Sequence, residues 1–203
     1  SGYYPDVYDV THGGGDINLV KANLYRIRYF IDKFKVNTIV DVNYHLYTNN
    51  NGKNLKKMQE LCDELDFSLS TVNSLVMPLE RVIDYIEGKD EAKTAELNKI
   101  LPVTIEEGIE IASEHKLDSC PFMHNQVNIN YDMSVPVCCT VFDQKDTIVQ
   151  KNYLESSLSD ISNGKDKVKM CTKCMDLSLP AYNMGFNRKK WDEIALEKIS
   201  TDL

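Results

Sequence analysis

The apolar positions in the first half of the chain follow a helical period and then a strand period. Residues 17–31 place apolar side chains three and four apart after Asp16, which predicts a helix with that aspartate as its N-cap. Residues 38–47 alternate apolar and polar side chains, which predicts a strand. A second helix at 53–65 and a second strand at 67–72 follow. The order helix, strand, helix, strand predicts an α/β fold with parallel strands.

The strand predicted at residues 38–47 has two different faces. Asp41, Asn43 and His45 alternate with the apolar side chains and share the polar face. At the edge of a sheet this face would simply meet water, whereas in a helix-covered parallel sheet it lines a barrel or a cleft. We therefore treat these three side chains as candidate binding residues.

The second half of the chain contains further helical periods, at residues 78–88, 104–115 and 187–199. Thr104 and Glu107 have the spacing of a capping box, which fixes the start of the second of these helices. Because that helix ends just before the first of a group of cysteines, we expect a domain boundary near residue 117.

A β-hairpin is predicted between the first two of these cysteines. Residues 127–130 and 135–138 are short β-type runs on either side of a polar turn. Residues 154–161 then repeat apolar side chains at helical spacing, which predicts a helix leading to the last cysteine pair.

Composition narrows the class of protein. The chain has 203 residues, of which 42% are hydrophobic, enough for one core or one core with a small appendage. A formal net charge of −8 argues against a nucleic-acid partner or an anionic membrane surface, because either would need a basic patch. There is no long apolar stretch and no targeting pattern at the start, so we expect a soluble, cytoplasmic protein.

Four cysteines, Cys120, Cys138, Cys171 and Cys174, are spaced C-x17-C-x32-C-x2-C. A CxxC pair can turn both sulfurs toward one ion or cluster while distant segments supply the other ligands, so the pattern predicts a zinc or iron–sulfur site. Zinc ribbons normally have two close pairs, and disulfides are disfavoured without a secretory signal. Cys62 lies on an apolar helical face and is expected to be a small buried thiol.

The second half resembles the SPASM/twitch auxiliary-cluster domain of radical S-adenosylmethionine (radical SAM) enzymes. The resemblance consists of a Cys-Pro before a hairpin, the Cys138-Cys139 pair on its return strand, a short helix and a closing CxxC. It implies that Cys120, Cys138, Cys171 and Cys174 hold one auxiliary [4Fe–4S] cluster, with Cys139 as the alternative to Cys138. No cysteine follows Cys174, so the smaller, single-cluster twitch form is implied.

The first half resembles the region after the fourth strand of a radical SAM barrel, through Ser1-Gly2, the loop ending at Gly13-Gly14-Gly15-Asp16, and Val20 with Asn23. The resemblance implies an α/β chain with three parts: residues 1–117 as the C-terminal part of a partial (β/α)6 barrel, 118–180 as a small α+β twitch domain, and 181–203 as a docking helix. It also implies that Ser1, Asn43 and His45 bind S-adenosylmethionine or substrate.

The sequence lacks the Cys-x3-Cys-x2-Cys motif that holds the first [4Fe–4S] cluster of these enzymes. The resemblance therefore implies the C-terminal portion of a longer enzyme, inactive alone, whose partner is the missing half of the barrel or a second copy of the chain. The full enzyme would oxidise or rearrange a small polar substrate such as a sugar or aminocyclitol, or modify a peptide. The alternative function is a non-catalytic zinc or iron–sulfur recognition module.

Overall fold

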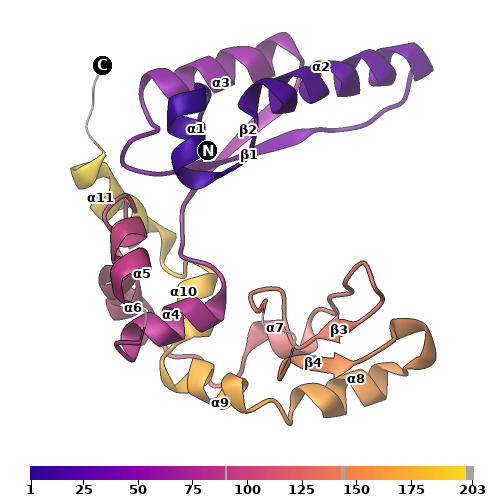
Figure 1. Ribbon diagram of the computed structural model, residues 1–203, viewed down its shortest axis with the longest axis vertical. Coiled ribbons are helices and arrows are strands. Elements are labelled where there is room, and N and C mark those ends of the chain that lie inside the picture. The colour runs from indigo at the N-terminus through magenta and orange to yellow at the C-terminus, as the bar shows by residue number, and fades with distance from the viewer. Residues whose placement is uncertain (90, 143–144, 200–203) are drawn as a thin grey trace. The chain divides into compact units, whose positions relative to one another are not determined.

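The computed structural model describes residues 1–89, 91–142 and 145–199, which form two compact units (Figure 1). The first unit contains Ser1–Ser74, Ile100–Pro102 and the described residues from Asp192 onward, and the second contains the described residues of Leu75–Lys99 and Val103–Trp191. This division falls near residue 75, whereas the sequence predicted a boundary near residue 117. The functional domain limits at 117 and 180 stay predictions.

The first unit is a small α/β layer. Its elements are α1 (Pro5–Thr11), α2 (Ile17–Phe34), β1 (Asp41–Leu46), α3 (Lys53–Glu64) and β2 (Ser68–Asn73). The two strands pair in parallel, with Asp41 opposite Ser68 and Leu46 opposite Asn73. The predicted order of helices and strands and their parallel pairing are confirmed. In the described parts of the chain there are two two-stranded sheets and no closed barrel.

One face of the β1–β2 sheet builds the core of this unit. Tyr44 is only 1% exposed and packs with Met58, Leu61 and Cys62 of α3. Asp16 caps α2, because its Oδ1 atom accepts hydrogen bonds from the backbone N–H groups of the first helical turn. The predicted N-cap and the predicted buried thiol of Cys62 are both confirmed.

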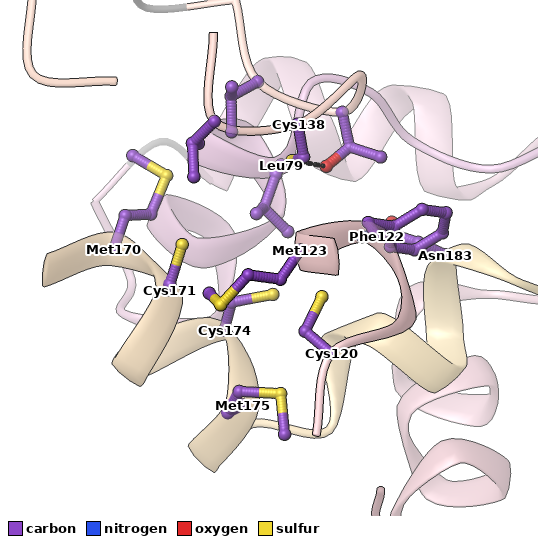
Figure 2. Close-up of a pocket in the computed structure, with 13 residues that line it drawn as sticks. Leu79, Cys120, Phe122, Met123, Cys138, Met170, Cys171, Cys174, Met175 and Asn183 are labelled. Carbon is purple, nitrogen blue, oxygen red and sulfur yellow. Dashed lines mark hydrogen bonds between the residues drawn. The ribbon is translucent and has the colours of Figure 1, made fainter. Parts of the chain in front are cut away.

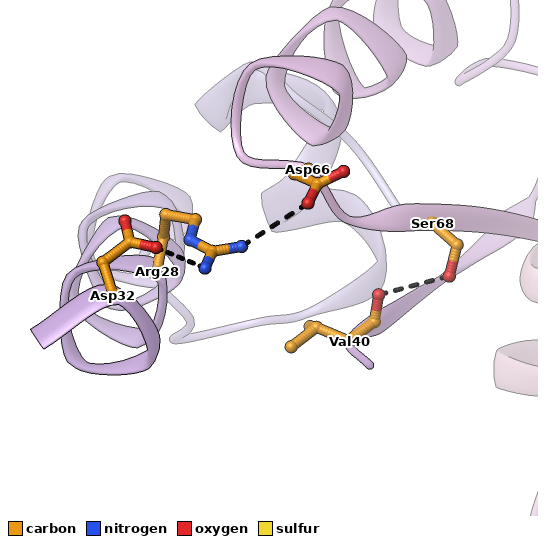
Figure 3. Close-up of polar contacts among 5 residues, drawn as sticks. All are labelled: Arg28, Asp32, Val40, Asp66 and Ser68. Atoms are coloured by element: carbon orange, nitrogen blue, oxygen red, sulfur yellow. Dashed lines mark hydrogen bonds and ion pairs between the residues drawn. The ribbon is translucent and has the colours of Figure 1, made fainter. Parts of the chain in front are cut away.

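Two polar contacts mark the turn from α3 into β2 (Figure 3). The guanidinium of Arg28 on α2 lies 3.8 Å from the carboxylate of Asp66, and it also pairs with Asp32 one turn further along the helix. The hydroxyl of Ser68 donates to the carbonyl oxygen of Val40 at 3.2 Å. Both acidic side chains are exposed, so the ion pairs contribute little to stability and the backbone pairing holds the sheet.

The second unit is mostly helical. Its elements are α4 (Leu79–Ile86), α5 (Glu91–Asn98), α6 (Ile105–Ser113), α7 (Pro121–His124), β3 (Val135–Pro136), β4 (Ile148–Gln150), a 3-10 helix η1 (Tyr153–Glu155), α8 (Leu158–Lys165), α9 (Lys169–Asp176), α10 (Leu179–Asn183) and the start of α11 (Arg188–Lys198). The capping box of Thr104 and Glu107 is confirmed, with both reciprocal hydrogen bonds present. Helix α6 packs closely on α10, because a Cβ atom at Gly108 would lie 2.7 Å from the Tyr182 ring.

The hairpin predicted between residues 127–130 and 135–138 is wrong. Residues 127–130 form no strand, and β3 pairs instead with β4 in antiparallel fashion. Val127 and Ile129 are 38% and 45% exposed, so they provide no buried face that would hold a strand, whereas Val135 is fully buried. The predicted turn at 131–134 does exist, with Asn130 donating its backbone N–H to the Ser134 carbonyl oxygen at 2.9 Å.

The helix predicted at 154–161 begins later than expected. Ser157 and Asp160 form a capping box that starts α8 at Leu158, and Leu154 lies before it in η1. Leu154 and Leu158 are 75% and 68% exposed, so only Ile161 of the predicted apolar stripe faces the core. None of the described helices is long and apolar enough to cross a membrane.

Candidate metal centre

Three separate segments carry the four cysteines singled out from the sequence. Cys120 is the N-cap of α7, and Pro121 begins that helix. Cys138 lies two residues after the end of β3. Cys171 and Cys174 lie three residues apart on α9, so both side chains emerge from one face of that helix.

All four thiols line one cavity (Figure 2). The cavity has a volume of about 20 Å³, room for about one water molecule. Apolar side chains make up most of its remaining wall, among them Leu79, Phe122, Met123, Met170 and Met175. All six cysteines of the chain are free thiols in the structure, so none of these four is engaged in a disulfide.

The structure separates the two adjacent cysteines. Cys138 lines the cavity, and its Sγ atom lies 3.1 Å from the hydroxyl of Thr140. Cys139 is exposed, is absent from the cavity wall and has the Gln126 side-chain amide 3.4 Å from its sulfur. The sequence left the roles of the two residues exchangeable, and the position of the cavity favours Cys138 as the metal-binding candidate.

Burial raises the pKa of three of the cavity thiols, those of Cys138, Cys171 and Cys174. Burial first, and then the neighbouring Cys138 and Cys120, raise the pKa of Cys171 to about 11. The pKa of Cys174 is also raised, first by burial and then by the three other cysteines. Each thiol is therefore within electrostatic reach of its neighbours, and a metal bound here must displace their protons.

The thiols surround the cavity without forming a coordination sphere. Among the residues that the structure describes, no group of three or more His, Cys, Asp and Glu side chains is placed so that it could hold a metal ion. Four thiolates around a tetrahedral zinc would bring their sulfurs to roughly 3.8 Å from one another. Figure 2 shows Met123 extending toward the two cysteines of α9, so loading would need this flexible side chain to turn away.

The donor set nevertheless suits a thiolate-bound metal. Four free thiols converge on an apolar wall, which is the ligand chemistry of zinc and of iron–sulfur clusters. The side-chain amide oxygen of Asn183, which also lines the cavity, is buried without a hydrogen-bond partner among the described atoms. A buried acceptor without a partner, beside four free thiols, is compatible with a bound ligand in this cavity.

The other candidate residues from the sequence lie in the first unit, on the open face of the β1–β2 sheet. Asp41, Asn43 and His45 are all exposed there, as their alternation predicted. Asp41 accepts hydrogen bonds from the hydroxyls of Ser68 and Ser70 at 2.7 and 2.9 Å, and the Asn43 amide donates to it at 3.3 Å. These side chains thus form a polar row across both strands.

Ser1 and His45 are brought together by a residue that the sequence reasoning missed. The buried Asn50 amide donates to the backbone carbonyl oxygens of Ser1 and His45 at 2.6 and 2.7 Å. Partial burial of the imidazole lowers the pKa of His45, and the nearby amino group of Ser1 lowers it further. The structure therefore places two of the three predicted cofactor-binding residues side by side, with Asn43 further along the same strand.

No protein-family model, curated protein sequence or solved structure matches this chain.

Proposed function

We propose that Cys120, Cys138, Cys171 and Cys174 together hold one metal centre, a single [4Fe–4S] cluster, and that the chain acts as the auxiliary-cluster portion of a radical SAM enzyme. The observation that supports this most is the convergence of four free thiols, from three segments far apart in sequence, on one apolar cavity. Bound iron–sulfur clusters are held by such thiolates, and an apolar surrounding is one of the factors that set their potential.

The residues around the cavity have defined tasks in this proposal. The four thiols release their protons and become the ligands. The Thr140 hydroxyl, 3.1 Å from Cys138, stabilises the thiolate form of that cysteine. Leu79, Met170 and Met175 keep water away from the sulfurs. When bound, the cluster supplies one-electron chemistry or a ligand position for substrate.

The wider activity is part of the same proposal and follows from the resemblance. The complete enzyme acts on a small polar substrate or a peptide, and Ser1, Asn43 and His45 bind S-adenosylmethionine or that substrate. The exposed polar row on β1 is compatible with a ligand-binding surface, because its side chains are open to solvent. Without the Cys-x3-Cys-x2-Cys motif this chain alone does not generate a radical.

A non-catalytic zinc module is the second candidate. It is favoured by the small volume of the cavity, about 20 Å³, which suits a single ion better than a four-iron cluster. In that case the four thiols would be structural ligands that stabilise the second unit.

Metal analysis separates the two candidates. The chain is purified and reconstituted without oxygen, with Fe²⁺ and sulfide in one sample and Zn²⁺ in another. The iron–sulfur proposal expects about four iron and four sulfide per chain, with broad absorption in the visible blue. One tightly held zinc with no stable iron would contradict the iron–sulfur proposal and support the zinc module. Binding of neither metal would contradict both proposals.

A further inference from the structure

A buried lysine ties down the segment that carries Cys120. Lys165, the last residue of α8, is 1% exposed. Its ammonium donates hydrogen bonds to the backbone carbonyl oxygens of Met123 and Gln126 at 2.8 and 2.6 Å. These partners are 42 and 39 residues away in the sequence, so the contact joins two distant segments of the second unit.

The position of these carbonyls matters for the thiol. Helix α7 has only four residues, and the carbonyls at the end of a helix lack intrahelical partners. The Lys165 ammonium supplies the missing donors for Met123 within α7 and for Gln126 just beyond it. Because Cys120 is the N-cap of this short helix, fixing its far end also fixes the direction of the Cys120 thiol.

The charge of Lys165 has no carboxylate partner among the residues that the structure describes. Its carbonyl partner Met123 lines the cavity of the four thiols, so thiolate charge at Cys138, Cys120 or Cys171 would act on the ammonium. A buried ammonium is costly unless an opposite charge compensates it. Four thiolates around Zn²⁺, or around an oxidised [4Fe–4S] core, carry a net charge of about −2 and would provide that compensation.

We propose that Lys165 is a positioning residue for Cys120 and the buried countercharge of the four-thiolate centre. The countercharge role rests on the proposed metal centre, whereas the positioning role does not. The four thiolates would make the centre anionic, so the positive charge of Lys165 would favour its more negative, reduced state.

The test uses the full chain with three substitutions. Lys165→Met removes both the charge and the hydrogen bonds at similar size, Lys165→Arg keeps the charge, and Lys167→Met changes an exposed lysine two residues away as the matched control. Lys165→Gln replaces Lys165→Met if the latter does not fold, because the amide keeps a donor without the charge.

The first measurement is hydrogen exchange of the metal-free protein. Lys165→Met is expected to speed exchange of the amides in residues 122–127 by about tenfold, because bonds from a charged donor are lost. Lys167→Met is expected to leave them unchanged. Unchanged exchange in Lys165→Met would overturn the positioning role, whether or not any metal binds.

The second measurement is the reduction potential of the cluster assembled from Fe²⁺ and sulfide. Removing a positive charge makes reduction harder, so Lys165→Met is expected to have a more negative potential, and Lys165→Arg to restore it. A potential unaffected by Lys165→Met would overturn the countercharge role. If the wild-type chain assembles no cluster, the iron–sulfur proposal fails and retention of Zn²⁺ against a chelator takes its place, with about tenfold weaker retention expected for Lys165→Met. A wild-type chain that retains neither metal would overturn the countercharge role, and the exchange measurement would still decide positioning.

Discussion

The Thr140 hydroxyl lies 3.1 Å from the Sγ atom of Cys138, on the wall of the cavity that the four thiols share. This contact lowers the pKa of Cys138, against the larger upward effect of burial. It is the one side-chain hydrogen bond among the described residues that reaches any of the four sulfurs.

Replacing Thr140 with valine is therefore expected to weaken metal loading. The substitution keeps the side-chain shape but removes the hydroxyl, which leaves the Cys138 thiolate less stable. We expect iron or zinc retention against a chelator to fall by about threefold to tenfold. Thr172→Val, an exposed threonine on α9, serves as the control, and an equal loss in both variants would contradict the role of Thr140.

The raised thiol pKa values predict a pH dependence of the metal-free protein. Cys171 has its pKa raised from 9.0 to about 11, so the folded state keeps a proton that the unfolded state releases above about pH 9. The stability from this group is complete below pH 9 and is lost as the pH rises toward 11. We expect the melting temperature to fall across this range, and to fall less in Cys171→Ser.

The control for the pH experiment is Cys139→Ser, because Cys139 is an exposed thiol outside the cavity. Its melting curve should follow the wild type at each pH. Metal loading should show the opposite trend, with tighter binding at higher pH because fewer protons must be displaced.

Gly108 allows a test of the packing that supports the cysteine-bearing unit. A Cβ atom there would lie 2.7 Å from the rings of both Tyr182 and Trp191, which are buried. Gly108→Ala is expected to lower the free energy of unfolding by about 1–3 kcal/mol in urea titrations. Gly13→Ala, where the added Cβ atom has nothing within 4 Å, should change it little, and equal effects would contradict the packing.

Asn50 offers a similar test in the first unit. Besides binding the Ser1 and His45 carbonyl oxygens, it accepts a hydrogen bond from the Tyr47 backbone N–H at 2.8 Å. Asn50→Ala is expected to lower the free energy of unfolding by about 3 kcal/mol, because buried backbone groups lose their partners. Asn49→Ala, at an exposed position in the same turn, is the matched control; a similar cost there would argue against this role.

Local patterns predicted individual elements of both units well. The helical period after Asp16, the alternation through Tyr44 and the capping box at Thr104 each depend on residues close in sequence, and all three appear in the structure. Predictions from neighbouring residues failed where a segment pairs with residues far away in the sequence. Residues 127–130 have β propensity, but β3 found its partner at Ile148–Gln150 instead.

In the candidate site, too, the sequence predicted some features and missed those that depend on distant contacts. The cysteine spacing alone predicted that four thiols converge, and the structure brings them to one cavity. The sequence could not choose between Cys138 and Cys139, because that choice depends on where the cavity lies. Lys165 could not be found from the sequence either, because its carbonyl partners lie about 40 residues away. Its only local signal is its position one helical turn after Ile161 on α8.

The most direct test of the metal centre compares Cys138→Ser with Cys139→Ser. Both variants are reconstituted without oxygen with Fe²⁺ and sulfide, and iron and sulfide are counted per chain beside the wild type. A centre held by the four cavity thiols predicts that Cys139→Ser keeps the full content of about four iron, while Cys138→Ser loses most of it. Equal iron in the two variants, or loss only in Cys139→Ser, would contradict the account.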